Sequence, residues 1–254
     1  MMSASGGAAL SVRGLCKSFG GLAIAQSIDL DLERGARVGL IGPNGAGKTT
    51  LVNLLTGTLA ADAGSIRLQG EPIDRLPAEA RVRRGLARTH QLNTLLPEAS
   101  ARDNVALAIA EREGIGWRLL RYARRWRACL EEADAQLEGV GGAGVADRRV
   151  AELAYGEQRL LEIAIALALK PRVLLLDEPA AGVPKSEAHA IHAALERLPA
   201  EVAILMIEHD MDLVFRFVRE IVVLVQGRIL RRGTPAEIAA DPEVRAVYLG
   251  RSAP

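Results

Sequence analysis

The chain has 254 residues, of which 49% are hydrophobic and 25% are charged, and its formal net charge is +1. This is ordinary globular composition, long enough for a full core in one large domain or a domain with a subdomain. The near-neutral charge gives no overall field that would favour nucleic acid. Cys16 and Cys129 lie in no metal or redox spacing, so we expect two small buried or half-buried residues, as in a reducing compartment.

The sequence shows neither an apolar run typical of a membrane-spanning helix nor the pattern of a secretory signal. The apolar runs are shorter than the roughly 18 residues that a membrane-spanning helix needs. The first residues, MMSASGGAALSVRG, have no basic segment before an apolar stretch, as a secretory signal would. We therefore expect a cytoplasmic protein that contacts a membrane only through a partner.

The first part of the chain is predicted to be rich in β-strands. Residues 10–41 alternate or run apolar between Gly and Asp breaks. The last of these strands ends in a glycine-rich loop, and residues 50–59 continue with helical spacing. This is a strand–loop–helix pattern, and residues 63–73 predict a short hairpin after it.

Residues 76–152 have a different texture, in which Arg-rich helical segments alternate with glycine breaks, and they predict a mostly helical insert. After it, apolar strands separated by helices imply an α/β fold with a parallel sheet. The elements expected after residue 153 are a helix, a strand at 173–177, a helix at 184–197, a strand at 202–209, a helix at 210–219 and a hairpin at 221–233.

The glycine-rich loop fits the phosphate-binding pattern GxxxxGK[ST] over residues 42–49. Its glycines let successive N–H groups point at phosphate oxygens, and the following helix adds the positive end of its dipole. Lys48 is expected to reach the β- and γ-phosphates, and Thr49 to hold Mg²⁺. The predicted ATP-binding residues of the loop are Gly42, Pro43, Asn44, Gly45, Ala46, Gly47, Lys48, Thr49 and Thr50.

Two carboxylates follow the apolar run VLLL at residues 173–176. The carboxyl end of a strand is where ligands bind in parallel α/β sheets. Asp177 is therefore expected to ligate Mg²⁺ directly or through water, and Glu178 to activate water as the general base. The alternative is a pair of surface carboxylates at a strand end.

The ordered set of motifs resembles the ATP-binding-cassette (ABC) ATPases over nearly the whole chain. The matching segments are the loop at 42–49, ARTHQ at 87–91, LAYGEQ at 153–158, VLLLDEP at 173–179, AAGVP at 180–184 and IEHD at 207–210. A phosphate-binding loop alone is shared by many nucleotide-binding folds, whereas this order is highly specific.

The resemblance implies an architecture and cofactors. The architecture is a P-loop NTPase core with a mostly parallel sheet, an N-terminal antiparallel β subdomain and a helical insert. One domain would span residues 8–250, with the helical subdomain at about 92–159 and the remainder at about 8–75 and 160–250. The cofactors would be ATP and Mg²⁺.

Three further site residues come from the resemblance. Phe19 matches the aromatic residue that stacks on adenine, the alternative being a core Phe. Gln91 matches a glutamine that approaches Mg²⁺ and the attacking water, the alternative being a loop glutamine. His209 matches a histidine that binds the γ-phosphate, the alternative being a structural histidine at a strand end. The loop at 181–183 matches one that touches the opposite subunit.

The segment LAYGEQ places Gly156 before a helix whose residues 160–169 are almost entirely apolar, which predicts a buried helix with an anion-binding N-terminus. In the resembled family this motif completes the ATP site of the opposite subunit. The matching residues are Ala154, Tyr155, Gly156 and Glu157. The common form is LSGGQ, so Ala154 stands where a serine hydroxyl would contact the γ-phosphate.

Within the family, LAYG, DEPAAG, IEHDM and VYLG look most like the ATPase subunits of branched-chain or hydrophobic amino acid importers. The implied partners are a second ABC ATPase subunit (identical or different), two membrane permeases and, indirectly, an extracytoplasmic solute-binding protein. The chain would then lie on the inner face of the cell membrane. Alternatives are uptake of urea, amides or aromatic acids, lipopolysaccharide export, a soluble cassette acting on nucleic acid or ribosomes, and a small-molecule P-loop kinase.

The stretch WRLLRYARRWRACLEE at residues 117–132 combines arginines with aromatic residues. The first interpretation is an amphipathic helix with a solvated face, because acidic residues follow at once. Contact with a permease or membrane surface and contact with nucleic acid are the alternatives.

Overall fold

The structure is a computed structural model that describes residues 7–89, 95–115 and 123–249. The chain forms two compact units. Unit 1 comprises Met1–Leu86, Arg172–Glu178 and Ala200–Pro254, and unit 2 comprises Ala87–Pro171 and Pro179–Pro199. The predicted limits of the helical subdomain, 92–159, stay a prediction.

Unit 1 contains an antiparallel sheet with the strand order β2-β1-β4-β5. The hairpin predicted for residues 63–73 is confirmed, because β4 and β5 pair antiparallel. The strands are β1 (Leu10–Phe19), β2 (Leu22–Leu32), β4 (Ala63–Leu68) and β5 (Glu71–Pro72).

The second sheet of unit 1 carries the order β10-β9-β3-β8-β7. Its neighbours β9, β3, β8 and β7 run parallel, and β10 pairs antiparallel with β9, which confirms the parallel sheet and the closing hairpin. Strands that are buried on both faces have continuous apolar sequences, which is why the run VLLL predicted a strand. The strands are β3 (Arg37–Ile41), β7 (Val173–Asp177), β8 (Ala203–Ile207), β9 (Glu220–Val225) and β10 (Arg228–Gly233).

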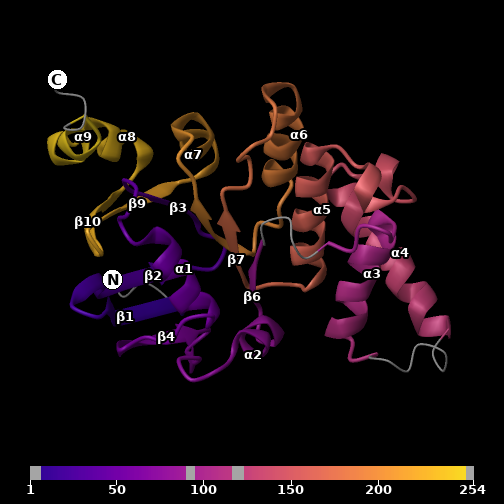
Figure 1. The fold of residues 1–254 in the computed structure, drawn as a ribbon, viewed down its shortest axis with the longest axis horizontal. Helices are drawn as coiled ribbons and strands as arrows, with labels where there is room; N and C mark the ends of the chain where they lie inside the picture. The colour runs from indigo at the N-terminus through magenta and orange to yellow at the C-terminus, as the bar shows by residue number, and fades with distance from the viewer. Residues whose placement is uncertain (1–6, 90–94, 116–122, 250–254) are drawn as a thin grey trace, which may run out of the picture. The chain divides into compact units, whose positions relative to one another are not determined.

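Two clusters of buried hydrophobic residues cover the two faces of this sheet. The larger cluster joins the two sheets and includes Leu10, Leu40 and Leu51, the last on α1 (Lys48–Thr56). The other cluster joins Ile41 and Val223 to three helices that lie together in Figure 1. These helices are α7 (Met211–Phe217), α8 (Pro235–Ala240) and α9 (Pro242–Leu249).

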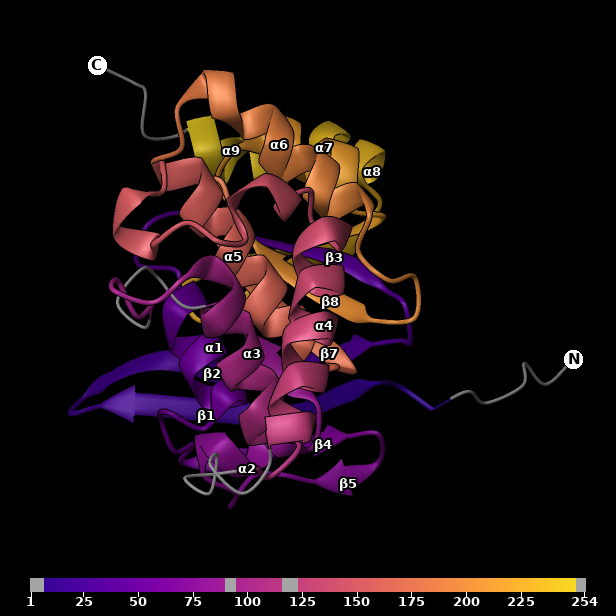
Figure 2. The same cartoon turned by 90° about the vertical axis from the view of Figure 1, so that its right-hand side faces the viewer.

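Unit 2 is built of helices, and the mostly helical character predicted for 76–152 is confirmed for the described residues. The helices of unit 2 are α3 (Ala101–Arg112), α4 (Ala123–Gly139), α5 (Tyr155–Ala168) and α6 (Lys185–Glu196). Helix α2 (Ala78–Arg83) belongs to unit 1, and the short strand β6 (Leu86–Arg88) follows it in the sequence. Helices α3, α4 and α5 pack on one another, as Figure 2 shows. Arg112 ties them together, since its Nη1 donates to Glu132 and to the carbonyl of Ala168.

Two local predictions need correction. The strand expected at 202–209 ends at Ile207, and Gly156 lies inside the first turn of α5 instead of before it. The Arg-rich stretch is described only from Ala123, where α4 begins. There Arg124, Arg125 and Arg127 are exposed while Cys129 is buried, so the described part is an amphipathic helix with a solvated face.

Candidate functional site

The phosphate-binding loop connects β3 to α1 as predicted. Gly47 precedes the first helical residue, Lys48, with φ of 101°, a left-handed conformation that a side chain would strain. Gly42 is restricted differently, because a Cβ there would collide with the main-chain carbonyl of Leu224 on β9. The two glycines therefore let the backbone turn tightly beneath the helix N-terminus.

The loop opens on a cavity of about 390 Å³ in unit 1. Its lining combines the loop with an aromatic ring and a carboxylate: Phe19, Ile24, Asn44, Gly45, Ala46, Gly47, Lys48, Thr49, Thr50 and Glu178. Phe19 is 52% exposed, with the Nζ of Lys17 5.6 Å from its ring centroid, so it is not a core residue. An exposed ring at this cavity is suited to stacking on a base.

Lys48 lies folded into its own loop. Its Nζ donates to the carbonyl oxygens of Gly42, at 2.7 Å, and Pro43, at 3.1 Å. Burial lowers the pKa of Lys48 below that of an ordinary lysine, while the nearby carboxylates act in the opposite direction. The carbonyls thus hold the ammonium group inside the loop, facing the carboxyl end of β7.

The two carboxylates at the carboxyl end of β7 occupy different positions. Asp177 is the last residue of the strand and pairs with Ile207 of β8. Glu178 follows with φ of 48°, a left-handed conformation that is unusual for a residue other than glycine. Such strain is found at functional sites when the surrounding structure enforces it. Here the N–H of Glu178 is bonded to the carbonyl of Ile207 at 2.9 Å.

His209 lies beside Glu178, with its Nδ1 3.5 Å from the Oε1 of Glu178, and its side chain is 71% exposed. An exposed ring has the access to solvent and ligand that a structural histidine in a core would lack. The structure thus brings His209 and Glu178 together, and their roles in catalysis stay predictions.

Glu208 is a residue of the site for which the motif alone suggested no role. It is 2% exposed, and its Oε2 accepts hydrogen bonds from the N–H groups of His209, at 2.9 Å, and Asp210, at 3.3 Å. These bonds fix the turn that carries His209 at the end of β8. The sequence signal was a carboxylate directly after an apolar strand, which normally indicates an exposed residue.

The residues present fit Mg²⁺ bound with a nucleotide. Among residues 7–89, 95–115 and 123–249, no group of three or more His, Cys, Asp or Glu side chains is arranged to hold a metal. Mg²⁺ bound with a nucleotide needs only one or two protein oxygens, because phosphates and waters complete its shell. Thr49 lines the cavity, and Asp177 ends β7 directly before Glu178, which also lines the cavity. Gln91, the third predicted ligand, lies outside the described residues.

The predicted second phosphate-binding segment forms the amino end of α5 in unit 2. Ala154 is the N-cap residue, and its N–H donates to Glu157 Oε2 at 2.8 Å. The N–H of Gly156 donates to Glu187 Oε2 at 2.9 Å. Tyr155 lies against Gly182, whose added Cβ would be 3.2 Å from the Tyr155 hydroxyl. The helix is buried, as predicted.

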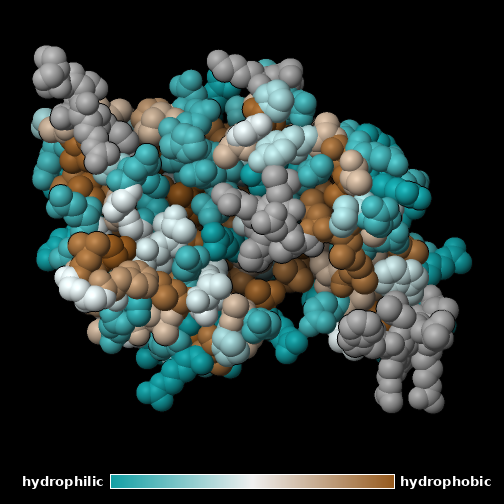
Figure 3. All heavy atoms as spheres, in the orientation of Figure 1, coloured by the Kyte–Doolittle hydropathy of each residue, from teal (hydrophilic) through white to brown (hydrophobic). Residues whose placement is uncertain are grey.

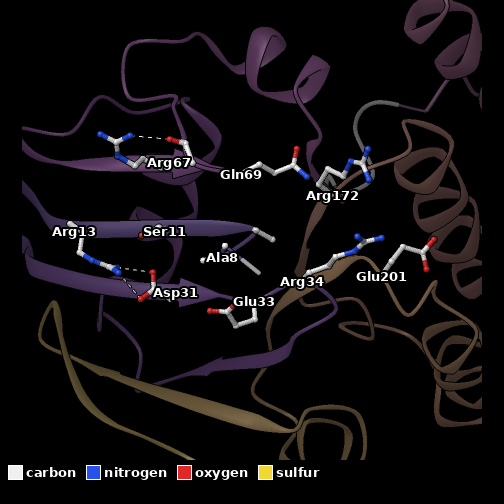
Figure 4. A pocket seen from close by; sticks show the side chains of 13 residues that line it. Ala8, Ser11, Arg13, Asp31, Glu33, Arg34, Arg67, Gln69, Arg172 and Glu201 are labelled. Carbon is white, nitrogen blue, oxygen red and sulfur yellow. Dashed lines mark hydrogen bonds and ion pairs between the residues drawn. The ribbon is translucent and has the colours of Figure 1, made fainter. Parts of the chain in front are cut away.

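A second cavity of unit 1, of about 690 Å³, lies at the opposite ends of the parallel strands (Figure 4). Its lining includes Arg34, Arg172 and Glu201, which precede β3, β7 and β8, and a surface pair of Arg13 with Asp31. Ligands of parallel α/β sheets bind at the carboxyl ends of the strands. The smaller cavity at the loop is therefore the candidate site.

The model of the ABC transporter family matches residues 25–181, which include the loop and both carboxylates. The chain belongs to the ABC transporter family. A second model, the branched-chain amino acid ATP-binding cassette transporter, matches residues 232–254 of this ABC protein. As a member of the family, the chain is an ATPase that binds nucleotide.

Among the relatives of this ABC ATPase is BraF of Pseudomonas aeruginosa, a high-affinity branched-chain amino acid transport ATP-binding protein, 41% identical over 96% of this chain and 98% of BraF. LivG of Escherichia coli, described by the same words, is 38% identical over 96% of this chain and 98% of LivG.

Among solved structures, the ADP conformation of MJ1267, an ATP-binding cassette of an ABC transporter, aligns with a TM-score of 0.82 at 29% identity, covering 96% of this chain and 99% of that one. Its α/β cassette fold is the fold of this chain.

Among the described residues, no helix is both long and apolar enough to cross a membrane. The face in Figure 3 mixes hydrophilic and hydrophobic residues.

Proposed function

We propose that this chain is an ATPase subunit of an ABC importer that takes up branched-chain or other hydrophobic amino acids. The observation that carries the solute class is the near full-length identity with BraF and LivG, both described as high-affinity branched-chain amino acid transport ATP-binding proteins. The residues that line the loop cavity support the ATPase activity in this proposal.

The cavity residues support a specific division of work. Lys48 and the N–H groups of the loop hold the phosphates and neutralise their charge, while Phe19 stacks on the adenine ring. Glu178 takes the proton of the attacking water, a contribution of roughly 10²–10⁴-fold. His209, 3.5 Å from Glu178, binds the γ-phosphate.

Thr49, Asp177 and Gln91 would hold Mg²⁺, which would neutralise phosphate charge when bound. The protein groups thus position the triphosphate and the water, since phosphoryl transfer depends on positioning and electrostatic stabilisation.

The amino end of α5 is proposed to bind the γ-phosphate of ATP held by a second ABC ATPase subunit, identical or different. Its first N–H groups, of which that of Gly156 already donates to a carboxylate, and its helix dipole are suited to an anion. Two permeases would anchor the pair on the inner face of the membrane, and an extracytoplasmic binding protein would deliver the solute. The chain itself would then lie in the cytoplasm.

The test is solute uptake by cells that lack the gene. Deletion is expected to remove high-affinity uptake of labelled leucine, isoleucine and valine, and the wild-type gene is expected to restore it. A Glu178→Gln gene, producing equal amounts of protein, should not restore it. Intact leucine uptake with loss of urea, acetamide or benzoate uptake would overturn the amino acid assignment and favour a related importer.

A further inference from the structure

The amino end of α5 is capped by a carboxylate from another helix. Its N-cap residue, Ala154, has no side-chain oxygen with which to accept from the second or third N–H of the helix, as serine or aspartate would. Glu187, in the first turn of α6, supplies that acceptor, because its Oε2 lies 2.9 Å from the nitrogen of Gly156. Glu187 therefore takes the place of a local N-cap side chain.

The space beside Gly156 is filled by this carboxylate. A Cβ added at Gly156 would lie 2.5 Å from the Oε2 of Glu187 and 3.1 Å from its Cβ. The glycine leaves open an approach to the helix amide, and an anionic oxygen already occupies that approach. Helix amino ends bind carboxylates and phosphates for the same reasons of free N–H groups and dipole.

Both helices are held in this arrangement by further contacts within unit 2. The ring of Tyr155 packs against Gly182, in the loop that leads into α6. From the other side, Arg159 donates to the Tyr155 hydroxyl at 2.8 Å, and Arg159 is itself bonded to Glu162 at 2.8 Å. These contacts fix the backbone around Gly156. The Glu187 side chain, in contrast, has three rotatable bonds and is only half-buried, so it can turn away.

We propose that Glu187 is a displaceable occupant of the half-site at Gly156. In the free subunit its carboxylate accepts the Gly156 N–H, and the γ-phosphate of the partner subunit's ATP replaces it. The inference rests on the proposed function of the α5 amino end. Because one N–H cannot serve both anions at once, association through ATP requires that this contact break, and Glu187 then raises the ATP concentration that the transporter needs.

The first test is the ATP concentration for half-maximal hydrolysis in the complex purified through a tag on this chain. Glu187→Ala removes a negative charge near the incoming phosphate, and we expect that concentration to fall about fivefold, the effect of one like charge at ~4 Å in water. Glu187→Gln keeps the size and a weaker acceptor, and we expect a smaller fall. An unchanged or higher ATP requirement in both variants would overturn the inference and leave Glu187 as a helix cap only.

A matched variant separates capping from competition. Ala154→Ser supplies a local N-cap hydroxyl that could also contact the γ-phosphate, so the double variant is compared with the Ala154→Ser single variant. With the helix end capped in both, adding Glu187→Ala should still lower the ATP requirement while thermal stability is kept. If it no longer lowers the ATP requirement, the effect of Glu187 is structural, and the inference fails.

A third variant tests the underlying function. Gly156→Asp fixes a carboxylate on the helix end, and it should abolish hydrolysis while ATP binding to the monomer is spared. Normal hydrolysis would reject the half-site itself. Loss of hydrolysis in Gly156→Asp, together with no effect of Glu187→Ala or Glu187→Gln, would reject only the role of Glu187.

Discussion

The left-handed backbone at Glu178 leads to a stability prediction that is separate from catalysis. With φ of 48°, a residue with a Cβ carries a conformational cost of about 1–2 kcal/mol. Glycine avoids this cost, although its greater freedom in the unfolded chain offsets about 0.5–1 kcal/mol. Glu178→Gly should therefore be more stable than Glu178→Ala by about 0.5–1 kcal/mol, and both variants lack the carboxylate.

The comparison is made by thermal and urea unfolding of the two purified variants. For a chain of this size the difference corresponds to a shift of about 1–4 °C in the midpoint. Steady-state hydrolysis should fall by roughly 10²–10⁴-fold in both variants and in Glu178→Gln, with ATP binding retained. Equal stability of the glycine and alanine variants would show that position 178 is unstrained and would refute the reasoning.

Three further changes test other parts of the molecule. Gly42→Ala places a Cβ against a main-chain carbonyl of β9 that cannot rotate away, so ATP binding should be lost, and normal affinity in a fluorescent-nucleotide titration would contradict this. The hydrogen bond from Arg112 lowers the pKa of Glu132, so the stability that Glu132 adds is present above an ordinary glutamate pKa of about 4.3 and is lost as pH falls through the lowered value. Urea unfolding should therefore show Glu132→Gln less stable than the wild type by up to about 1 kcal/mol at pH 7, with a difference that shrinks as the pH falls below the ordinary glutamate pKa, whereas a constant difference would exclude this cause. Glu162→Ala leaves the buried guanidinium of Arg159 without its carboxylate and should cost about 3–5 kcal/mol by calorimetry, while a loss below 1 kcal/mol would contradict the pairing.

The elements predicted best are those whose signal is local. Strand β7 was predicted at its observed bounds because four apolar residues stand between a proline-containing turn and two carboxylates. The phosphate-binding loop was predicted equally well, because the glycine spacing specifies its backbone and Lys48 indicates a phosphate ligand. In each case the segment contains everything that determines its structure.

The features that escaped prediction depend on contacts far apart in sequence. The start of α5 was placed too late because Ala154 is a poor N-cap residue and Gly156 a poor helix former, and the stabilising acceptor is Glu187, 31 residues away. Glu208 received no role from the sequence, and its burial is made tolerable by two backbone N–H groups whose positions no local pattern specifies. The strain at Glu178 is likewise set by the surrounding sheet and has no sequence pattern.

The phosphate-binding loop and the amino end of α5 share one feature, which is that a polar donor in each is paired with an oxygen of the protein. In unit 1 the ammonium of Lys48 is bonded to two carbonyl oxygens of its own loop, and in unit 2 the N–H of Gly156 is bonded to Glu187. A polar group left unpaired in a partly buried site costs about 1–3 kcal/mol, so both donors are paired with oxygen acceptors of the protein. Under the proposed function, each donor exchanges an oxygen acceptor of the protein for a phosphate oxygen when ATP binds. The donor is therefore paired in both states. The binding free energy then reflects the difference between two acceptors, which makes the internal acceptor, and Glu187 above all, a determinant of ATP affinity.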